Sequence, residues 1–241
     1  MVIQKVLEIR GEQPRIGGRK LYKLLSGELQ QPEVKVGRDK FFSLLSEAGL
    51  LIKRKRKHVS TTNSHHRFYT YNNLLKNKLL SRSQQAYVAD ITYLRTQQGF
   101  VYLFLLTDAY SRKIVGWNLS NSLGIDGGLS ALKMAIKHTN HPEGLIHHSD
   151  RGIQYCSNGY VKLLKKHKIQ ISMTEENHCY ENGLAERVNG ILKEDFLLDA
   201  VWPDYVTARK AVAHAVETYN NRRPHWSLGL QVPSVVHQKA G

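Results

Sequence analysis

The sequence is poor in cysteine, in long apolar runs and in acidic charge. Its 241 residues include two cysteines, Cys156 and Cys179, which are not in CxxC spacing. A disulfide framework and a structural zinc site are therefore poorly supported, because both need clustered cysteines. No apolar run approaches the ~20 residues of a membrane-spanning helix, and the first residues show neither the apolar segment nor the cleavage site of a secretory signal. We expect a cytoplasmic protein with reduced thiols.

The deficit of acidic residues leaves a strongly basic chain. It has 35 Lys and Arg residues against 20 Asp and Glu residues, a formal net charge of +15. The excess is concentrated in residues 1–80, which hold 17 basic and 6 acidic residues. A basic half of this kind is typical of a surface that binds a polyanion, most often nucleic acid. A basic surface that serves only solubility is the alternative.

Three short helices are predicted in the basic half. Apolar residues recur at helical spacing in residues 2–10, 19–26 and 37–47, and glycines and prolines separate the three segments. Short helices with tight turns and a basic surplus favour a helix-turn-helix module. Arg38 and Lys40 stand near the start of the third helix, where such helices meet base edges. A small basic bundle without sequence preference is the alternative.

A basic arm follows the predicted module. Its five consecutive cations cannot be buried together, so the segment is expected to be solvated and to lie along DNA phosphates. These cations are Lys53, Arg54, Lys55, Arg56 and Lys57. Residues 59–84 are rich in Ser, Thr, Asn, His and Lys, which predicts a linker with a short helix at 73–80. The chain is thus divided into a helix-turn-helix domain with its arm at 1–58, a linker at 59–84 and a larger domain at 85–241.

The larger domain alternates predicted strands with predicted helices. Residues 100–108 are almost continuously apolar, which predicts an interior strand buried on both faces. The order of elements predicts an α/β fold, a mixed five-stranded sheet with flanking helices of the ribonuclease H-like type, ending in a helical tail. Strands are predicted at 86–96, 100–108, 113–119, 145–148 and 170–174, and helices at 125–138, 158–168, 182–197 and 204–221.

Three carboxylates in the larger domain are candidates for catalysis. Asp90 lies inside an apolar predicted strand, where a carboxylate is costly unless it is paired, hydrated or bound to a cation. Asp150 ends the fourth predicted strand, and Glu186 lies on a later helix. Three carboxylates from separate elements could converge on two divalent cations, which activate the attacking oxygen and stabilise the leaving oxygen of a phosphodiester. Magnesium prefers such oxygen ligands.

The residues around these carboxylates resemble a known family. The segments YVADITY, HHSDRGIQY and ENGLAERVNGILKED contain Asp90, Asp150 and Glu186 in turn. They are similar to the catalytic segments of DDE-class transposases with an integrase core, which bacterial insertion sequences encode. The resemblance extends to the N-terminal GGRKLYKLL segment and to the tail YNNRRPH. Within this family the chain looks like the second-reading-frame product, OrfB.

The resemblance implies a reaction and partners. It implies metal-dependent cleavage at the ends of an insertion sequence followed by strand transfer, with Asp90, Asp150 and Glu186 as catalytic metal ligands for two Mg²⁺ or Mn²⁺ ions. The implied partners are double-stranded DNA at the element ends and at the target, further copies of the chain, and the first-frame product. The implied location is the bacterial cytoplasm, in association with the nucleoid. A DNA-binding regulator and a ribonuclease H-like nuclease that does not join strands are the alternatives.

Further residues are expected to assist the carboxylates. Seven residues turn a helix by about 700°, so Lys193 shares a helix face with Glu186 and is expected to contact DNA. Neighbours in a strand point to opposite faces, so at most one of His147 and His148 faces the site, and His148 is the better candidate. The residues with expected supporting roles are His148, Asn182, Arg223 and His225.

Overall fold

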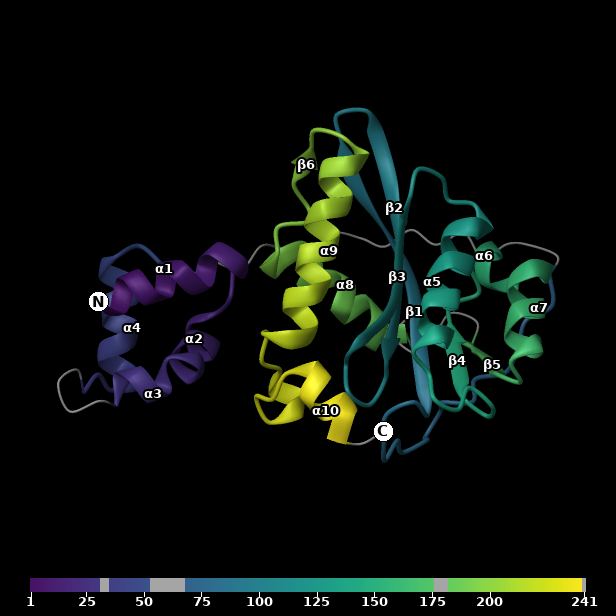
Figure 1. The fold of residues 1–241 in the computed structure, drawn as a ribbon, viewed down its shortest axis with the longest axis horizontal. Helices are drawn as coiled ribbons and strands as arrows, with labels where there is room; N and C mark the ends of the chain where they lie inside the picture. The colour runs from purple at the N-terminus through teal and green to yellow at the C-terminus, as the bar shows by residue number, and fades with distance from the viewer. Residues whose placement is uncertain (31–34, 53–67, 176–181, 240–241) are drawn as a thin grey trace.

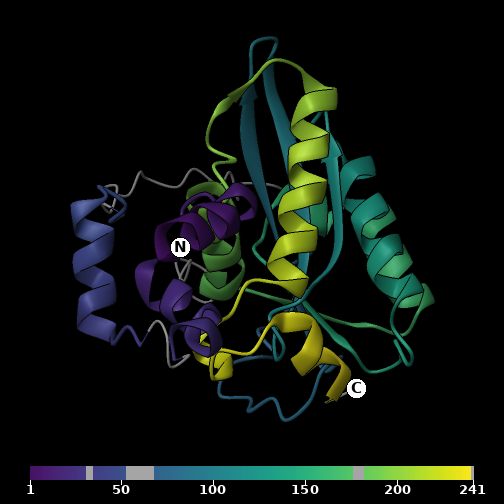
Figure 2. The same ribbon diagram turned by 60° about the vertical axis from the view of Figure 1, so that its left-hand side comes forward.

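The computed structural model describes residues 1–30, 35–52, 68–175 and 182–239. A group of N-terminal helices lies beside a larger α/β domain, as Figures 1 and 2 show from two directions. The basic arm at residues 53–57 and Cys179 lie outside the described residues. Within the described part of the chain, no helix is both long and apolar enough to cross a membrane.

Four helices form the N-terminal group, where three were predicted. They are α1 (Val2–Glu12), α2 (Gly18–Leu24), α3 (Ser26–Leu29) and α4 (Arg38–Glu47). The predicted helix at 19–26 is interrupted at Leu25, and a separate turn of helix follows it. The four helices share a small apolar core that includes Val6, Leu21 and Phe41. This group therefore has a core of its own.

The sheet of the larger domain has six strands, not the five predicted. Five of them follow the order β3-β2-β1-β4-β5, and the sixth, β6, pairs with the far end of β1. β1, β2 and β3 are antiparallel neighbours, whereas β4 and β6 run parallel to β1. The strands are β1 (Ala86–Thr96), β2 (Gly99–Asp108), β3 (Ile114–Ser120), β4 (Ile146–Ser149), β5 (Gln170–Met173) and β6 (Val201–Trp202).

One edge of β1 is covered at its two ends but not in the middle. β4 pairs with residues 86–88 of β1, and β6 pairs with Arg95 and Thr96. Among the described residues, no strand pairs with residues 89–94 on this edge. No described strand therefore covers the edge of β1 beside Asp90.

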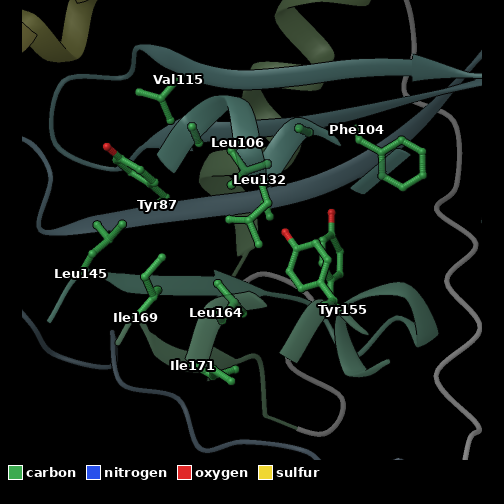
Figure 3. Close-up of a cluster of buried hydrophobic side chains, with 14 of the residues drawn as sticks. Tyr87, Phe104, Leu106, Val115, Leu132, Leu145, Tyr155, Leu164, Ile169 and Ile171 are labelled. Carbon is green, nitrogen blue, oxygen red and sulfur yellow. The ribbon is translucent and has the colours of Figure 1, made fainter. Parts of the chain in front are cut away.

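Helices cover both faces of the sheet. α5 (Ile125–Lys137) and α7 (Asn158–Lys166) pack on one face, with the short α6 (Ile153–Cys156) beside them. Figure 3 shows the buried side chains between this layer and the sheet, among them Tyr87, Phe104 and Leu132. α5 lies so close to β3 that a Cβ on Gly116 would be 2.2 Å from the carbonyl oxygen of Ala131. Glycine at this position therefore permits the close packing. α8 (Gly183–Asp195) and α9 (Tyr205–Asn221) cover the opposite face.

The described end of the predicted linker packs against the larger domain. The amide of Met173 donates to the carbonyl of Asn72, and the amide of Leu74 donates to Oγ of Ser172 at 2.8 Å. The helix predicted at 73–80 is wrong. Oδ1 of Asn73 accepts hydrogen bonds from the amides of Leu75 and Lys76, but the segment makes only a turn there and does not continue as a helix. The last elements of the described residues are the 3₁₀ turn η2 (Trp226–Leu228) and α10 (Pro233–Lys239).

Candidate active site

Asp90 and Asp150 come from adjacent parallel strands. The register between β1 and β4 pairs Tyr87 with His147 and Val88 with His148. Continued by two residues, it sets Asp90 opposite Asp150, which follows directly after β4. The two carboxylates are close enough for the charge of Asp150 to act on Asp90.

Asp90 is half-buried and bonded through both carboxylate oxygens. Oδ1 accepts from the amide of Ile91 at 2.9 Å, and Oδ2 accepts from Nδ2 of Asn189 at 2.7 Å. Burial and then the nearby charge of Asp150 raise the pKa of Asp90 to about 7, whereas the two hydrogen bonds act in the opposite direction. An ionised Asp90 beside Asp150 is therefore costly without a compensating positive charge.

Glu186 lies in the first turn of α8 and its side chain is exposed. Its charge also raises the pKa of Asp90, but by less than that of Asp150. Among the described residues, no three His, Cys, Asp or Glu side chains are close enough together to hold a metal ion. The structure thus brings Asp90 and Asp150 together and leaves Glu186 nearby but outside their immediate group.

Two asparagines on the α8 side of β1 complete the surroundings of Asp90. Asn182, at the start of α8, donates from Nδ2 to the carbonyl of Ala89 at 3.0 Å, and Asn189 contacts Asp90 as described. The Oδ1 atoms of both asparagines are buried and have no hydrogen-bond partner among the described residues. Asn189 was not among the predicted site residues. Its spacing of three residues from Glu186 was the available signal, because residues three apart share a helix face.

Lys193 lies two turns beyond Glu186 on α8, as the helical spacing predicted. Its Nζ is 4.6 Å from the centre of the Tyr93 ring. Burial lowers the pKa of Lys193, whereas the charges of Asp90 and Asp199 oppose this shift. Lys193 is therefore close enough to Asp90 for their charges to interact.

His147 and His148 point in opposite directions from β4. Nε2 of His147 contacts the Tyr160 hydroxyl at 2.9 Å, and burial lowers the pKa of His147 to about 3. Nδ1 of His148 contacts Oγ of Ser172 at 2.8 Å. His148 shares its register position with Val88, two residues before Asp90 on the same face of β1.

Arg223 and His225 lie at the C-terminal end of α8, away from the carboxylates. Nε and Nη2 of Arg223 donate to Oδ2 of Asp195, the last residue of α8, at 3.0 and 2.6 Å. The rings of His225 and Tyr219 are 4.8 Å apart, and burial and the charge of Arg223 lower the pKa of His225 to about 2. Both residues are buried, so their geometry favours bracing of α8 over DNA contact.

The N-terminal helices are joined to the same end of α8. The amide of Arg15 donates to the carbonyl of Asp195 at 3.0 Å, and Glu12 forms an ion pair with Arg222. Arg38 and Lys40 are exposed in the first turn of α4, and Arg38 contacts Asp39. The helix predicted to contact DNA thus presents both cations to solvent.

The residues around Asp90 fit a divalent cation. Two adjacent carboxylates supply the hard oxygen donors that magnesium prefers. A cation between them offsets the repulsion that raises the pKa of Asp90. The buried oxygens of Asn182 and Asn189, which lack hydrogen-bond partners among the described residues, add acceptors close to the carboxylates.

Comparison with known proteins identifies the family. A family model of the integrase core domain matches residues 81–179. A second family model of the same domain matches residues 167–233. The chain is 35% identical over 217 residues to an uncharacterized 31 kDa protein of insertion element IS600 from Shigella sonnei, covering 89% of this chain and 80% of the relative. The chain belongs to the integrase-core transposases of bacterial insertion sequences. The transposase of IS629 from Shigella sonnei is 32% identical over 218 residues, covering 90% of this chain and 72% of the relative.

A further relative is transposase InsF of IS3A from Escherichia coli K12. It is 34% identical over 189 residues, covering 77% of this chain and 66% of the relative. As a member of this family, the chain is a DNA transposase, a polynucleotidyl transferase of the kind that depends on a divalent metal. The family assignment agrees with the resemblance noted in the sequence.

Solved structures confirm the ribonuclease H-like fold of this transposase. The catalytic core domain of HTLV-2 integrase in complex with magnesium gives a TM-score of 0.51 at 20% identity, covering 64% of this chain and 96% of that chain. A simian T-cell lymphotropic virus intasome in complex with a PP2A regulatory subunit gives a TM-score of 0.55 at 18% identity, covering 92% of this chain and 70% of that chain. The confirmed fold includes the mixed sheet and its flanking helices.

Proposed function

We propose that Asp90, Asp150 and Glu186 are the catalytic carboxylates of this transposase. The observation that supports this most directly is the closeness of Asp90 and Asp150, which follow the paired segments of β1 and β4 and interact through their charges. The hydrogen bond from Asn189 to Asp90 holds α8, the helix that also carries Glu186, against the same site. The proposed reaction is cleavage at the ends of an insertion sequence, which exposes a 3′-hydroxyl, followed by attack of this hydroxyl on a second phosphodiester.

Each residue of the site has a distinct proposed task. Asp90 and Asp150 would hold Mg²⁺ or Mn²⁺, and Glu186 on α8 is the third proposed ligand. Two such ions, when bound, activate the attacking oxygen and stabilise the leaving oxygen. Asn189 fixes the orientation of the Asp90 carboxylate through Oδ2. Lys193 supplies a positive charge for the phosphate backbone of the DNA substrate.

We propose that the N-terminal helices bind double-stranded DNA at the element ends. Arg38 and Lys40 are exposed in the first turn of α4, which suits contacts with base edges. The five cations at 53–57 are proposed to neutralise backbone phosphates. His148 and Asn182 support the site from β4 and from the start of α8, and Arg223 and His225 brace the far end of α8.

The proposed assembly is an oligomer of the transposase on DNA. Strand transfer brings two element ends and a target together, which one catalytic domain cannot hold alone. The first-reading-frame product is a further proposed partner. Because bacterial insertion elements encode the relatives, we place the reaction in the cytoplasm, at the nucleoid.

The test is an assay of cleavage and joining on duplexes that carry the element end. Asp150→Asn and Glu186→Gln each remove a negative oxygen and keep the side-chain size. We expect both to lose cleavage almost entirely in magnesium while DNA binding stays within about twofold. The control is Glu217→Gln, which changes an exposed carboxylate on α9. Normal cleavage by both site variants would reject the assignment, and cleavage by the unaltered chain without joining would indicate a simple nuclease.

A further inference from the structure

Two exposed aromatic side chains lie side by side on the β1–β2 hairpin. Tyr93 is 46% exposed and Phe100 is 53% exposed. Their ring centres are 5.2 Å apart with the planes at 80°. In the register of the hairpin, Tyr93 is paired with Tyr102 and Phe100 with Arg95, so Tyr93 and Phe100 are diagonal neighbours on one face. An exposed pair of aromatic rings presents apolar surface to which a ligand can bind.

Positive charge surrounds this aromatic pair. Nζ of Lys193 lies 4.6 Å from the centre of the Tyr93 ring, and Arg95 is exposed two residues further along β1 on the same face as Tyr93. Lys193 and Arg95 are close enough for their charges to interact. Aromatic rings beside cations are the combination with which proteins bind single-stranded nucleic acid, because the rings stack on bases and the cations attract the backbone.

The pair is also close to the proposed catalytic carboxylates. Tyr93 follows Asp90 by three residues in β1, so the two side chains leave the strand on opposite faces. Lys193 links them at the strand edge, because it interacts with the charge of Asp90 and its Nζ contacts the Tyr93 ring. The segment from Asp90 to Tyr93 lies on the part of the β1 edge that no described strand covers. A DNA strand whose backbone contacts Lys193 can therefore approach both Asp90 and the Tyr93 ring.

We propose that Tyr93 and Phe100 form a stacking site for an unpaired DNA base next to the phosphodiester that is cleaved or joined. Lys193 and Arg95 hold the backbone of the same nucleotide. The site selects DNA ends whose terminal base pairs are open, since a base inside a duplex does not offer its face to a ring. This inference rests on the proposed function, because it takes the carboxylates as the place of reaction.

A purely structural role explains less of the geometry. Cross-strand aromatic pairs stabilise hairpins, but that contribution does not require both residues to stay about half exposed. The cation–π contact occupies one side of the Tyr93 ring, and Phe100 meets that ring at a steep angle and not face to face. The exposed parts of Tyr93 and Phe100 are the surface that the proposal assigns to a base.

The experiment measures stacking directly and without cleavage. The full chain carrying Asp150→Asn is mixed with a duplex whose last few base pairs are replaced by mismatches, with 2-aminopurine at an unpaired position. We expect strong quenching of the 2-aminopurine fluorescence. Tyr93→Leu is expected to abolish the quenching and to weaken binding of the open-ended duplex about tenfold. Tyr93→Phe retains the ring and is expected to retain both properties.

The controls separate stacking from a general loss of structure. Tyr69→Leu removes another exposed aromatic in a similar edge-to-face pair, beside Tyr71, and is expected to leave quenching unchanged. Binding of a fully paired duplex is expected to change less than about twofold in every variant that keeps the parent melting temperature. Quenching that survives in both Tyr93→Leu and Phe100→Leu would overturn the proposal, as would an equal loss of affinity for open and paired ends.

The outcome also separates this proposal from the proposed function. Quenching by the Asp150→Asn chain that depends on Tyr93, together with no cleavage by the unaltered chain in Mg²⁺ or Mn²⁺, would support the stacking site and contradict the catalytic assignment. Cleavage that proceeds normally in Tyr93→Leu on paired and open ends alike would contradict the stacking site and leave the catalytic assignment intact.

Discussion

Asn189 donates a hydrogen bond of 2.7 Å from Nδ2 to Oδ2 of Asp90, and this bond connects α8 with β1. Asn189 stands three residues after Glu186, so both side chains lie on nearby faces of the same helix. The orientation of one proposed ligand therefore depends on the position of the helix that carries another. A small shift of α8 would alter the Asp90 carboxylate and Glu186 together.

Replacing Asn189 by Ala is expected to slow DNA cleavage. Hydrogen bonds to charged groups contribute ~1.5–3 kcal/mol, so a loss of about tenfold or more is expected. The bond lowers the pKa of Asp90, and without it that pKa rises further. Because the reaction needs ionised Asp90, the acidic limb of the rate–pH profile is expected to move to higher pH. Asn221→Ala on the exposed surface of α9 is the control, and an unshifted profile in Asn189→Ala would contradict the prediction.

Asp90→Asn is expected to stabilise the metal-free protein at neutral pH. The folded pKa of about 7 lies above the ordinary value of 3.8, so between these values the folded state binds more protons than the unfolded state. Stability linked to Asp90 is thus complete below about pH 4 and lost as pH rises through about 7. In a chelator, the melting temperature of Asp90→Asn relative to the parent should rise over this window, by ~2–4 °C for each kcal/mol. A constant difference across the window would refute this, and Asp126→Asn at the start of α5 is the control.

The ion pair between Arg223 and Asp195 is expected to stabilise the fold. The Arg223 side chain is 4% exposed and that of Asp195 is 22% exposed. Removing one partner of a buried pair leaves an uncompensated charge, and a loss of about 3 kcal/mol is expected for Arg223→Met in urea unfolding. The double variant with Asp195→Leu is expected to recover part of this loss. Strictly additive losses would show that the two side chains are not coupled. Glu143→Gln, in the exposed pair with Lys168, is expected to cost less than ~1 kcal/mol.

Replacing the five cations at 53–57 by Gln is expected to weaken binding to all duplexes. Each lost phosphate contact lowers the slope of log affinity against log salt by ~0.9. The matched control replaces five exposed lysines on α5 and α7, which are Lys133, Lys137, Lys162, Lys165 and Lys166. Equal changes of slope in both variants would show that the arm has no special role. Arg38→Gln or Lys40→Gln is expected to reduce the preference for the element end instead.

Long elements with a clear pattern could be predicted from the sequence, and single turns could not. β1 runs from Ala86 to Thr96 as expected, because a sustained run of apolar and aromatic residues defines it. α6 has four residues and β6 has two, too few for any periodic pattern to develop. Neither was predicted. At 73–80 the pattern indicated a helix, but the side chain of Asn73 bonds to the backbone and forms a turn.

In the candidate site, too, features with a local sequence pattern could be predicted and features that depend on packing could not. Asp90 and Asp150 could be placed together because each is tied to a strand whose position follows from local pattern. The bond from Asn189 to Asp90 depends on how α8 packs against β1, and no local pattern encodes that packing. The contact between Lys193 and the Tyr93 ring arises in the same way.

The uncovered stretch of the β1 edge has a consequence for how the protein behaves in solution. An exposed strand edge invites pairing with another chain, and proteins protect such edges against aggregation. Here Nδ2 of Asn182 donates a hydrogen bond to the Ala89 carbonyl, and the Ile91 amide donates one to the carboxylate of Asp90. Polar side chains of the site thus take the backbone positions that a neighbouring strand would use. The same groups that position the carboxylates also keep the open edge from recruiting a second molecule.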